Sequence, residues 1–430
     1  MGPIDSTNWF KRGRLVEQFG QQNNSSITEM GPLAGITVVD LSSVVVGPTC
    51  TLTLADHGAE VIKVEAPEGD LMRTLGGGAR NPGMTGKFMN FNRNKRSICV
   101  NLKTEEGLFL LKKVLAKADV LVTNMRLGAL QKLGLDYASL KAMNPQLIYC
   151  QILAFGRGGT YFNRPAYDTV IQSSAGVSAT FEKSSGEPRF VPLVMGDHIT
   201  GLVSAQTIGF ALFRRTRTKV GELIEIPMFE TMAAFVLREH MGNMTFEPGI
   251  GPIGDARVLD KNNRPVKTAD GYISISPNTN AQAFAFFDAI GRPELKVDPR
   301  FDNVTNRTKN SVEYYEIRSS SLGSKTSAEW IEIFERIDIP CMRYNSLEDL
   351  LEDPHIQSVN FLQQTVHPSE GLIREIGLTN KFSGGNRQGF TPAPRLGENT
   401  IEILQEFGAS EQEIEQALAT SAIVQHRQST

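Results

Sequence analysis

The stretch Ile36-Thr-Val-Val-Asp-Leu41 is a short apolar run, and its composition predicts a buried strand. Gly47 and Pro48 open a segment with helical apolar spacing, which Gly58 closes. The stretch Val61-Ile-Lys-Val-Glu65 is a second apolar run and predicts a second strand. A strand, a helix and a strand in this order form the βαβ unit of a parallel sheet. This part of the chain therefore predicts an α/β fold.

The same alternation continues along the chain. We predict from it a large domain with an open, doubly wound parallel sheet. Shorter helical segments are expected near Ala129 and Tyr137. The other predicted elements are strands over residues 97–102, 120–123, 147–152 and 222–226, and helices over 105–118, 198–215 and 229–240.

The alternation of predicted strands and helices ends at Gly242. A loop rich in glycine and proline leads to a turn and a strand over residues 268–275. Helical spacing then returns from Ser327 onward. We therefore expect a second, smaller α+β domain in the middle of the chain.

Composition excludes several classes of protein. The 430 residues carry 44 Lys and Arg against 47 Asp and Glu, which gives a net charge of −3. Nucleic-acid binders usually show a basic excess, so we expect no nucleic-acid partner. No run of 18 apolar residues is present, so no membrane span is expected.

The cysteines and the first 30 residues bear on location. Cys50, Cys99, Cys150 and Cys341 form no C-x-x-C pair and stand at no zinc-ligand spacing from a histidine. Free thiols are typical of a reducing compartment, and we expect a cytoplasmic protein. Residues 1–30 lack an apolar core of signal-peptide length and predict a tail or arm rather than a transit peptide.

Motifs for the common cofactors are absent from the sequence. No G-x-G-x-x-G follows the first predicted strand, where backbone N–H groups would approach a pyrophosphate, and no P-loop is present. The six histidines form no H-E-x-x-H pair, so we expect no metal site and no permanently bound cofactor. The G-x-S-x-G elbow of a serine hydrolase is also absent.

Three polar clusters carry the remaining chemistry. Asn90–Ser97 is either a solvated turn or a grip for an anion. Gly156–Asp168 is a glycine-rich loop after a predicted strand, where open α/β folds place ligands. In Met195–His198, Asp197 is either a structural N-cap or a nucleophile oriented by the helix dipole. Spacing alone leaves these alternatives open.

At these residues the sequence resembles the class III coenzyme A (CoA) transferases, or CaiB/BaiF family. That family also contains crotonobetaine/carnitine and formyl/oxalate CoA transferases and the α-methylacyl-CoA racemases. The resemblance covers about residues 32–420, and its motifs are specific in combination. The matching stretches are Pro32–Leu41, Gly47–Pro48, Ala55–Glu65, Asn92–Ile98, Ala118–Leu121, Leu133–Leu135, Pro165–Asp168, Gly196–Asp197, Asp338–Pro340, Asp353–His355 and Pro394–Glu398.

The resemblance implies a large α/β, CoA-binding domain built from both ends of the chain and a smaller central α+β domain. In this family two chains thread through one another as an interlocked ring, so an interlocked homodimer is implied. The expected divisions are a tail over 1–30, the first part of the large domain over 31–227, the small domain over 228–325 and a return to the large domain over 326–430.

The resemblance also matches Asp197 to the catalytic aspartate of the family's Gly-Asp motif. Its carboxylate would attack the donor thioester, and CoA would pass to an acceptor acid through an aspartyl mixed anhydride and an aspartyl-CoA thioester. Backbone N–H groups of a glycine loop would stabilise each oxyanion. Gly249 and Gly251 are candidates, although their loop departs from the tetraglycine form of some members. Asp168 and Val45 are further candidates for substrate contact.

Seven residues fall on CoA-contact positions by the same resemblance, and a lysine among them would meet the phosphates of CoA. Lys132 stands where some members have Arg. Val45 replaces a Gln of the formyl-CoA transferases and Ala66 replaces an Arg, and both departures weaken a formyl/oxalate assignment. The contact positions are Val100, Lys103, Asn124, Met125, Ala129, Lys132 and Tyr167.

The racemase branch is an alternative enzyme. Racemases carry a catalytic His 30 residues before the shared aspartate, and Tyr167 stands at that place here. A phenol with a pKa of about 10 is a poor base near neutral pH, so we favour a transferase acting on an acyl-CoA and a carboxylic acid. A catalytically silent CoA-binding protein is the third hypothesis, and the retained Asp197 argues against it.

Overall fold

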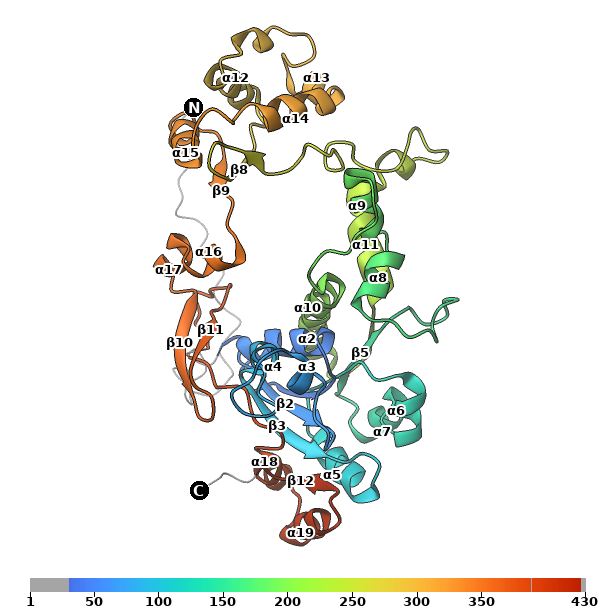
Figure 1. Ribbon diagram of the computed structural model, residues 1–430. Helices are drawn as coiled ribbons and strands as arrows, with labels where there is room; N and C mark the ends of the chain where they lie inside the picture. The colour runs from blue at the N-terminus through green and yellow to red at the C-terminus, as the bar shows by residue number, and fades with distance from the viewer. Residues whose placement is uncertain (1–30, 388, 427–430) are drawn as a thin grey trace, which may run out of the picture.

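The computed structural model describes residues 31–387 and 389–426 (Figure 1). The tail expected over residues 1–30 lies outside the described residues. A seven-stranded sheet in the order β12-β3-β2-β1-β4-β5-β6 forms the centre of the larger unit, and all of its pairs are parallel except β12 with β3. Its strands are β1 (Thr37–Leu41), β2 (Glu60–Glu65), β3 (Lys95–Val100), β4 (Val120–Thr123), β5 (Ile148–Leu153), β6 (Leu223–Pro227) and β12 (Ile423–Val424).

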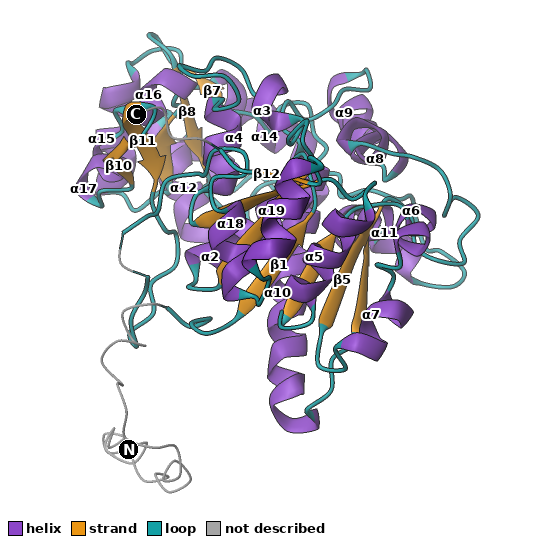
Figure 2. Ribbon diagram, turned by 90° about the horizontal axis from the view of Figure 1, so that it is seen from below, coloured by secondary structure: helices purple, strands orange, loops and turns teal. Residues whose placement is uncertain are grey.

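Helices cover both faces of this sheet (Figure 2). Val38 and Val39 of β1 are both fully buried but belong to different apolar cores, because successive side chains of a strand point to opposite faces. The first face is covered by α2 (Val46–Asp56), α8 (Asp168–Ser174), α10 (Met195–Thr218) and α11 (Met228–His240). The second is covered by α5 (Glu105–Leu115), α6 (Leu127–Leu133), α7 (Tyr137–Met143), α18 (Thr400–Glu406) and α19 (Glu411–Ala419).

The order of the six parallel strands is that of the doubly wound dinucleotide-binding folds. Strands are added to one side of β1 as far as β3 and then, from β4 onward, to its other side, so the strand order reverses between the parallel neighbours β1 and β4. Ligands in such sheets bind in the crevice outside the carboxyl ends of the strands at this switch point. The predicted large parallel-sheet domain is confirmed, and the turns after β1 and β4 are the place to look for a site.

A second unit has a three-stranded antiparallel sheet and its own aromatic core. Phe286, Trp330 and Phe334 are almost completely buried in it. The unit therefore extends past the boundary expected at residue 325, because the amphipathic helix from Ser327 packs on this core. Its elements are β7 (Val266–Lys267), β8 (Tyr272–Ile275), β9 (Cys341–Arg343), α12 (Asn280–Ala289), α13 (Val304–Lys309), α14 (Ser311–Ser320), α15 (Ser327–Arg336) and a 3₁₀ turn, Pro293–Lys296.

Two separate limbs join the units in Figure 1. Helices α9 (Val177–Ser185) and α11, followed by a 3₁₀ turn at Gly242–Thr245, form the outgoing limb. Met232 of α11 is buried in the core of the large unit, so the boundary expected at residue 228 falls inside that core. The returning limb contains α16 (Leu347–Leu351), α17 (Pro354–Ser358) and the hairpin of β10 (Leu362–His367) and β11 (Gly371–Ile376).

The returning limb is anchored on two short helices that the sequence pattern did not predict, α3 (Met72–Leu75) and α4 (Gly86–Asn92), and on the loop between them. Arg80 donates to the carbonyls of Glu370 and Leu372, and Asn81 bonds the Glu370 carboxylate. Beyond the hairpin, β12 pairs with β3, and the chain is back in the first sheet.

Candidate active site

Asp197 is the third residue of α10 and is 8% exposed. Helix α10 begins at Met195, three residues before the predicted start, and Val194 is its N-cap residue. The N-cap alternative for Asp197 is therefore wrong. Val194 has no side chain that can accept a hydrogen bond, so α10 lacks a cap of its own.

The cap comes instead from Asp168, the first residue of α8. Its Oδ1 accepts hydrogen bonds from the backbone N–H groups of Gly196, at 2.7 Å, and Asp197, at 3.3 Å. Gln172 donates to the other oxygen at 2.7 Å. A Cβ at position 196 would lie 3.1 Å from Asp168 Oδ1, so glycine allows this close approach. The Gly-Asp motif and the Pro165–Asp168 motif thus meet in space.

This arrangement changes the acidity of the nucleophile candidate. Burial and the nearby Asp168 carboxylate raise the pKa of Asp197 to about 7, and the charge of Lys87 opposes this rise. Burial, followed by the Lys87 charge, lowers the pKa of the neighbouring His198. A carboxyl group with a pKa near neutrality is typical of functional sites, where ionisation is tuned by the surroundings.

Helix α4 lies against the start of α10. The rings of Phe91 and His198 are 5.5 Å apart between centroids. Val194 packs against an apolar cluster that includes Val45, Phe88 and Phe91. Val45 is 1% exposed, so this candidate forms one apolar wall beside the first turn of α10.

The turn after β1 is held by hydrogen bonds to two residues that follow other strands of the sheet, Asn124 and Asp70. The side chain of Asn124, which follows β4, bonds both the N–H and the carbonyl of Ser43 across the switch point. Val44 has a φ of 73°, a left-handed conformation that β-branched residues rarely adopt. Its N–H donates to Asp70, whose carboxylate is ion-paired with the fully buried Lys63 at 2.9 Å.

The residues expected to contact CoA lie at the carboxyl edge of the sheet. Lys103 follows β3, Asn124 and Met125 follow β4, and the exposed Ala129 and Lys132 lie on α6. Val100 also ends β3, but its side chain is fully buried, so only its backbone can face a ligand. Tyr167 is 70% exposed at the start of α8.

The two candidate oxyanion glycines lie elsewhere in this chain. Gly249 and Gly251 are in the loop after α11, and their nearest neighbours, Met244 and Asn243, belong to the same loop. The contacts of the single chain do not tie these glycines to Asp197, so their role stays a prediction.

Both alternatives for Asn90–Ser97 are wrong. Arg93 is ion-paired with Asp56 at 2.6 Å, and the fully buried Lys95 is ion-paired with Asp40 at 3.0 Å. Arg96 pairs with Glu60 and Glu406. All three cations are neutralised by carboxylates of the same chain. The segment is therefore not a solvated turn, and its cations are not available to bind a phosphate. Sequence spacing does not reveal such pairs, because the partners lie on other strands and helices.

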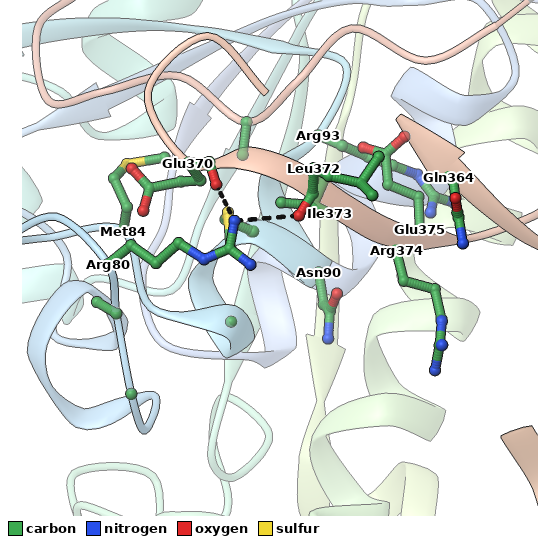
Figure 3. A pocket seen from close by; sticks show the side chains of 15 residues that line it. Arg80, Met84, Asn90, Arg93, Gln364, Glu370, Leu372, Ile373, Arg374 and Glu375 are labelled. Atoms are coloured by element: carbon green, nitrogen blue, oxygen red, sulfur yellow. Dashed lines mark hydrogen bonds between the residues drawn. The ribbon is translucent and has the colours of Figure 1, made fainter. Parts of the chain in front are cut away.

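A cavity of about 690 Å³ lies between residues 78–93 and the β10–β11 hairpin (Figure 3). Met89 and Asn90 line it from α4, so this helix separates the cavity from the first turn of α10, which Phe91 contacts. Within the described residues, no group of His, Cys, Asp and Glu side chains is arranged to hold a metal ion. No described helix is long and apolar enough to cross a membrane. Cys50, Cys99, Cys150 and Cys341 carry free thiols.

Comparison with known proteins identifies the family of this chain. The model of the family described as CoA-transferase family III matches residues 33–400. A (R)-2-hydroxy-4-methylpentanoate CoA-transferase from Clostridioides difficile is 31% identical over 392 residues, covering 89% of this chain and 97% of that protein. A succinyl-CoA:glutarate CoA-transferase from Mus musculus is 31% identical, covering 94% and 92%.

A solved structure gives the same result. The crystal structure of a CaiB/BaiF family protein from Brucella suis has a TM-score of 0.75 and 31% sequence identity, and covers 88% of this chain and 99% of that chain. The family expected from the sequence motifs is thereby confirmed, and with it the transferase rather than the racemase alternative. The chain belongs to CoA-transferase family III and is an enzyme of the CoA-transferase class.

Proposed function

We propose that this enzyme moves CoA from an acyl-CoA to a free carboxylic acid, with Asp197 as the nucleophile. One observation carries the proposal: the Asp197 carboxyl group is buried in the first turn of a long helix, beside the carboxylate of Asp168. Burial and this neighbour raise its pKa to about 7. A carboxylate that is poorly solvated is a stronger nucleophile than one in water. Near neutral pH enough of Asp197 is ionised to attack a thioester.

The reaction proceeds in four exchanges at three carbonyl carbons, those of the donor, of Asp197 and of the acceptor. Asp197 attacks the donor acyl carbonyl, and CoA thiolate leaves a mixed anhydride. The thiolate attacks the Asp197 carbonyl of the anhydride and releases the donor carboxylate, giving an aspartyl-CoA thioester. The acceptor carboxylate attacks that thioester, which forms a second mixed anhydride with Asp197 and releases CoA thiolate again. The thiolate then attacks the acceptor carbonyl, which regenerates Asp197 and yields the new acyl-CoA.

Residues at the carboxyl edge of the sheet support a binding site for CoA. Lys103 and Lys132 are exposed cations at that edge and are proposed to meet phosphates of the nucleotide. Asn124 fixes the turn at the switch point, where such folds bind their ligands. With its nucleotide on these residues, CoA would direct its thiol toward the turn at Val45 and on to Asp197. The exchange conserves the energy of the thioester and needs no further cofactor.

We further propose an interlocked homodimer. Leu202, Phe210 and Phe213 lie on one side of α10 and are each more than half exposed in the single chain. A contiguous apolar face of this kind marks a protein interface. The two limbs, which run apart between the units, would allow a second chain to pass between them (Figure 1). The free, mostly buried thiols fit a cytoplasmic location.

The test is the Asp197→Ala variant, assayed for CoA exchange between labelled acids and acyl-CoAs. We expect loss of exchange with an unchanged dimer, and full exchange in the variant would refute the proposal. Hydroxylamine added during turnover should convert Asp197 of the wild type into a hydroxamate, which mass spectrometry detects. Asp136→Asn, at the N-cap of α7, is the matched control and should exchange CoA normally.

A further inference from the structure

Lys87 is a cation on α4, the helix that packs against the first turn of α10. It is half-buried on α4, and it forms no ion pair with the residues that the structure describes. Three cations in the neighbouring sequence are paired: Arg73 with Glu65, Arg93 with Asp56 and Lys95 with Asp40. An ammonium that is partly removed from water gains from a paired anion, so an unpaired one points to a ligand.

The geometry of α4 places Lys87 at the first turn of α10. Lys87 and Phe91 are four residues apart in one helix and therefore share a face. Phe91 contacts His198 on that face. The charge of Lys87 also lowers the pKa of both Asp197 and His198, which agrees with a place for Lys87 on the side of α4 that faces α10.

We propose that Lys87 is a specificity-determining residue, and that it binds a second carboxylate of a dicarboxylic acid substrate. The inference rests on the proposed function, because it assumes that the acid reacts at Asp197. The reacting carboxyl group becomes a neutral anhydride or thioester during the exchange and cannot pair with a cation throughout. A second carboxylate, separated by a short carbon chain, stays ionised in every intermediate. It would pair with the Lys87 ammonium while the first is bonded to Asp197.

The phosphates of CoA and the Asp197 carboxylate are the two other anions that could pair with Lys87. The phosphates of CoA have Lys103 and Lys132 at the edge of the sheet. Asp197 itself forms no ion pair with Lys87 within the described residues. If Lys87 served only Asp197, all acids would depend on it equally.

The experiment compares glutarate with valerate, which have the same number of carbons but differ in the second carboxylate. Succinyl-CoA is the donor in both arms. Because the donor acid leaves before the acceptor binds, kcat/KM for the acceptor reports the acceptor alone. The variants are Lys87→Met, Lys87→Arg and, as a matched control, Lys117→Met. Lys117 is an exposed lysine between α5 and β4, at the opposite edge of the sheet.

We expect Lys87→Met to lower the glutarate-to-valerate ratio of kcat/KM by roughly 10- to 100-fold, the effect of losing a hydrogen bond to a charged group. Lys87→Arg should keep most of the ratio, and Lys117→Met all of it. CoA affinity, measured by calorimetry, should not change in any variant. Thermal unfolding of each variant checks that the fold is intact.

Three results would overturn the inference. They are an equal loss for glutarate and valerate, no loss for either acid, and weaker binding of CoA by Lys87→Met. The proposed function fails separately, if the wild type transfers CoA to no acid or transfers it as well without Asp197.

Discussion

The raised pKa of Asp197 predicts that the wild-type enzyme is less stable than a variant without this carboxyl group. Asp197→Asn keeps the shape of the side chain and removes its charge. The pKa is about 7 in the folded chain against an ordinary value of 3.8. Above pH 7 this difference lowers the free energy of unfolding of the wild type by about 4 kcal/mol. The side chain is almost fully buried, so solvent does not screen the effect.

The pH dependence follows from the sign of the shift. Because the folded pKa is raised, the unfolded chain loses its proton first, and the wild type loses stability as the pH rises from 3.8 to about 7. Asp197→Asn escapes this loss. Its gain over the wild type should be about 2 kcal/mol at pH 5 and about 4 kcal/mol at pH 8, and should level off above that.

Urea denaturation of both proteins at pH 5 and pH 8 measures the gain as a shift of the midpoint. Asp136→Asn is the control. Hydrogen bonds outweigh burial and lower the pKa of Asp136, so removing this carboxyl group should not increase the free energy of unfolding at pH 8. The reasoning is refuted if Asp197→Asn is no more stable than the wild type at pH 8. An identical gain at both pH values would refute it as well.

Two further predictions concern the surroundings of Asp197. Asp168→Asn removes the charge that helps to raise the pKa of Asp197, so the acid limb of the pH profile of kcat/KM should move to lower pH; an unmoved limb would contradict this. Gly201→Ala would place a Cβ 2.6 Å from the carbonyl oxygen of Val46, where α2 packs on α10, and should destabilise the enzyme by about 1–3 kcal/mol in urea. Gly128→Ala, on α6 with open space around it, should not destabilise the enzyme, and equal effects of the two alanines would argue against close packing as the cause.

Periodicity predicted the parallel strands well, because buried strands of such a sheet are continuous apolar runs. The strands over 120–123 and 148–153 were placed within a residue of their observed ends. The two-residue strand β12 is too short to leave a pattern, and the hairpin β10–β11 has mixed burial that hides its alternation. The boundaries at 228 and 325 differ from the observed cores because helical spacing does not tell on which core a helix packs.

Asp197 was predicted from a short motif that the family shares, and its chemistry was not readable from spacing. Its pKa depends on burial and on Asp168, 29 residues earlier in the chain, and only the fold brings the two together. Lys87 had no motif at all. Its only signal in the sequence is its place four residues before Phe91, which puts both on one face of a helix. The sequence does not show that this face lies against His198.

The pairing of β12 with β3 has a consequence for how the enzyme is made. Ile423 pairs with Val100, so more than 300 residues must leave the ribosome before the edge of β3 is covered. At a typical rate of about 5–20 residues per second, that edge stays open for roughly 15–60 seconds. An open edge strand pairs readily with other chains. Nascent chains of this enzyme should therefore need a chaperone until the segment from Asn399 to Val424 has been made, because Asn399 and Thr400 also bond the edge of β3.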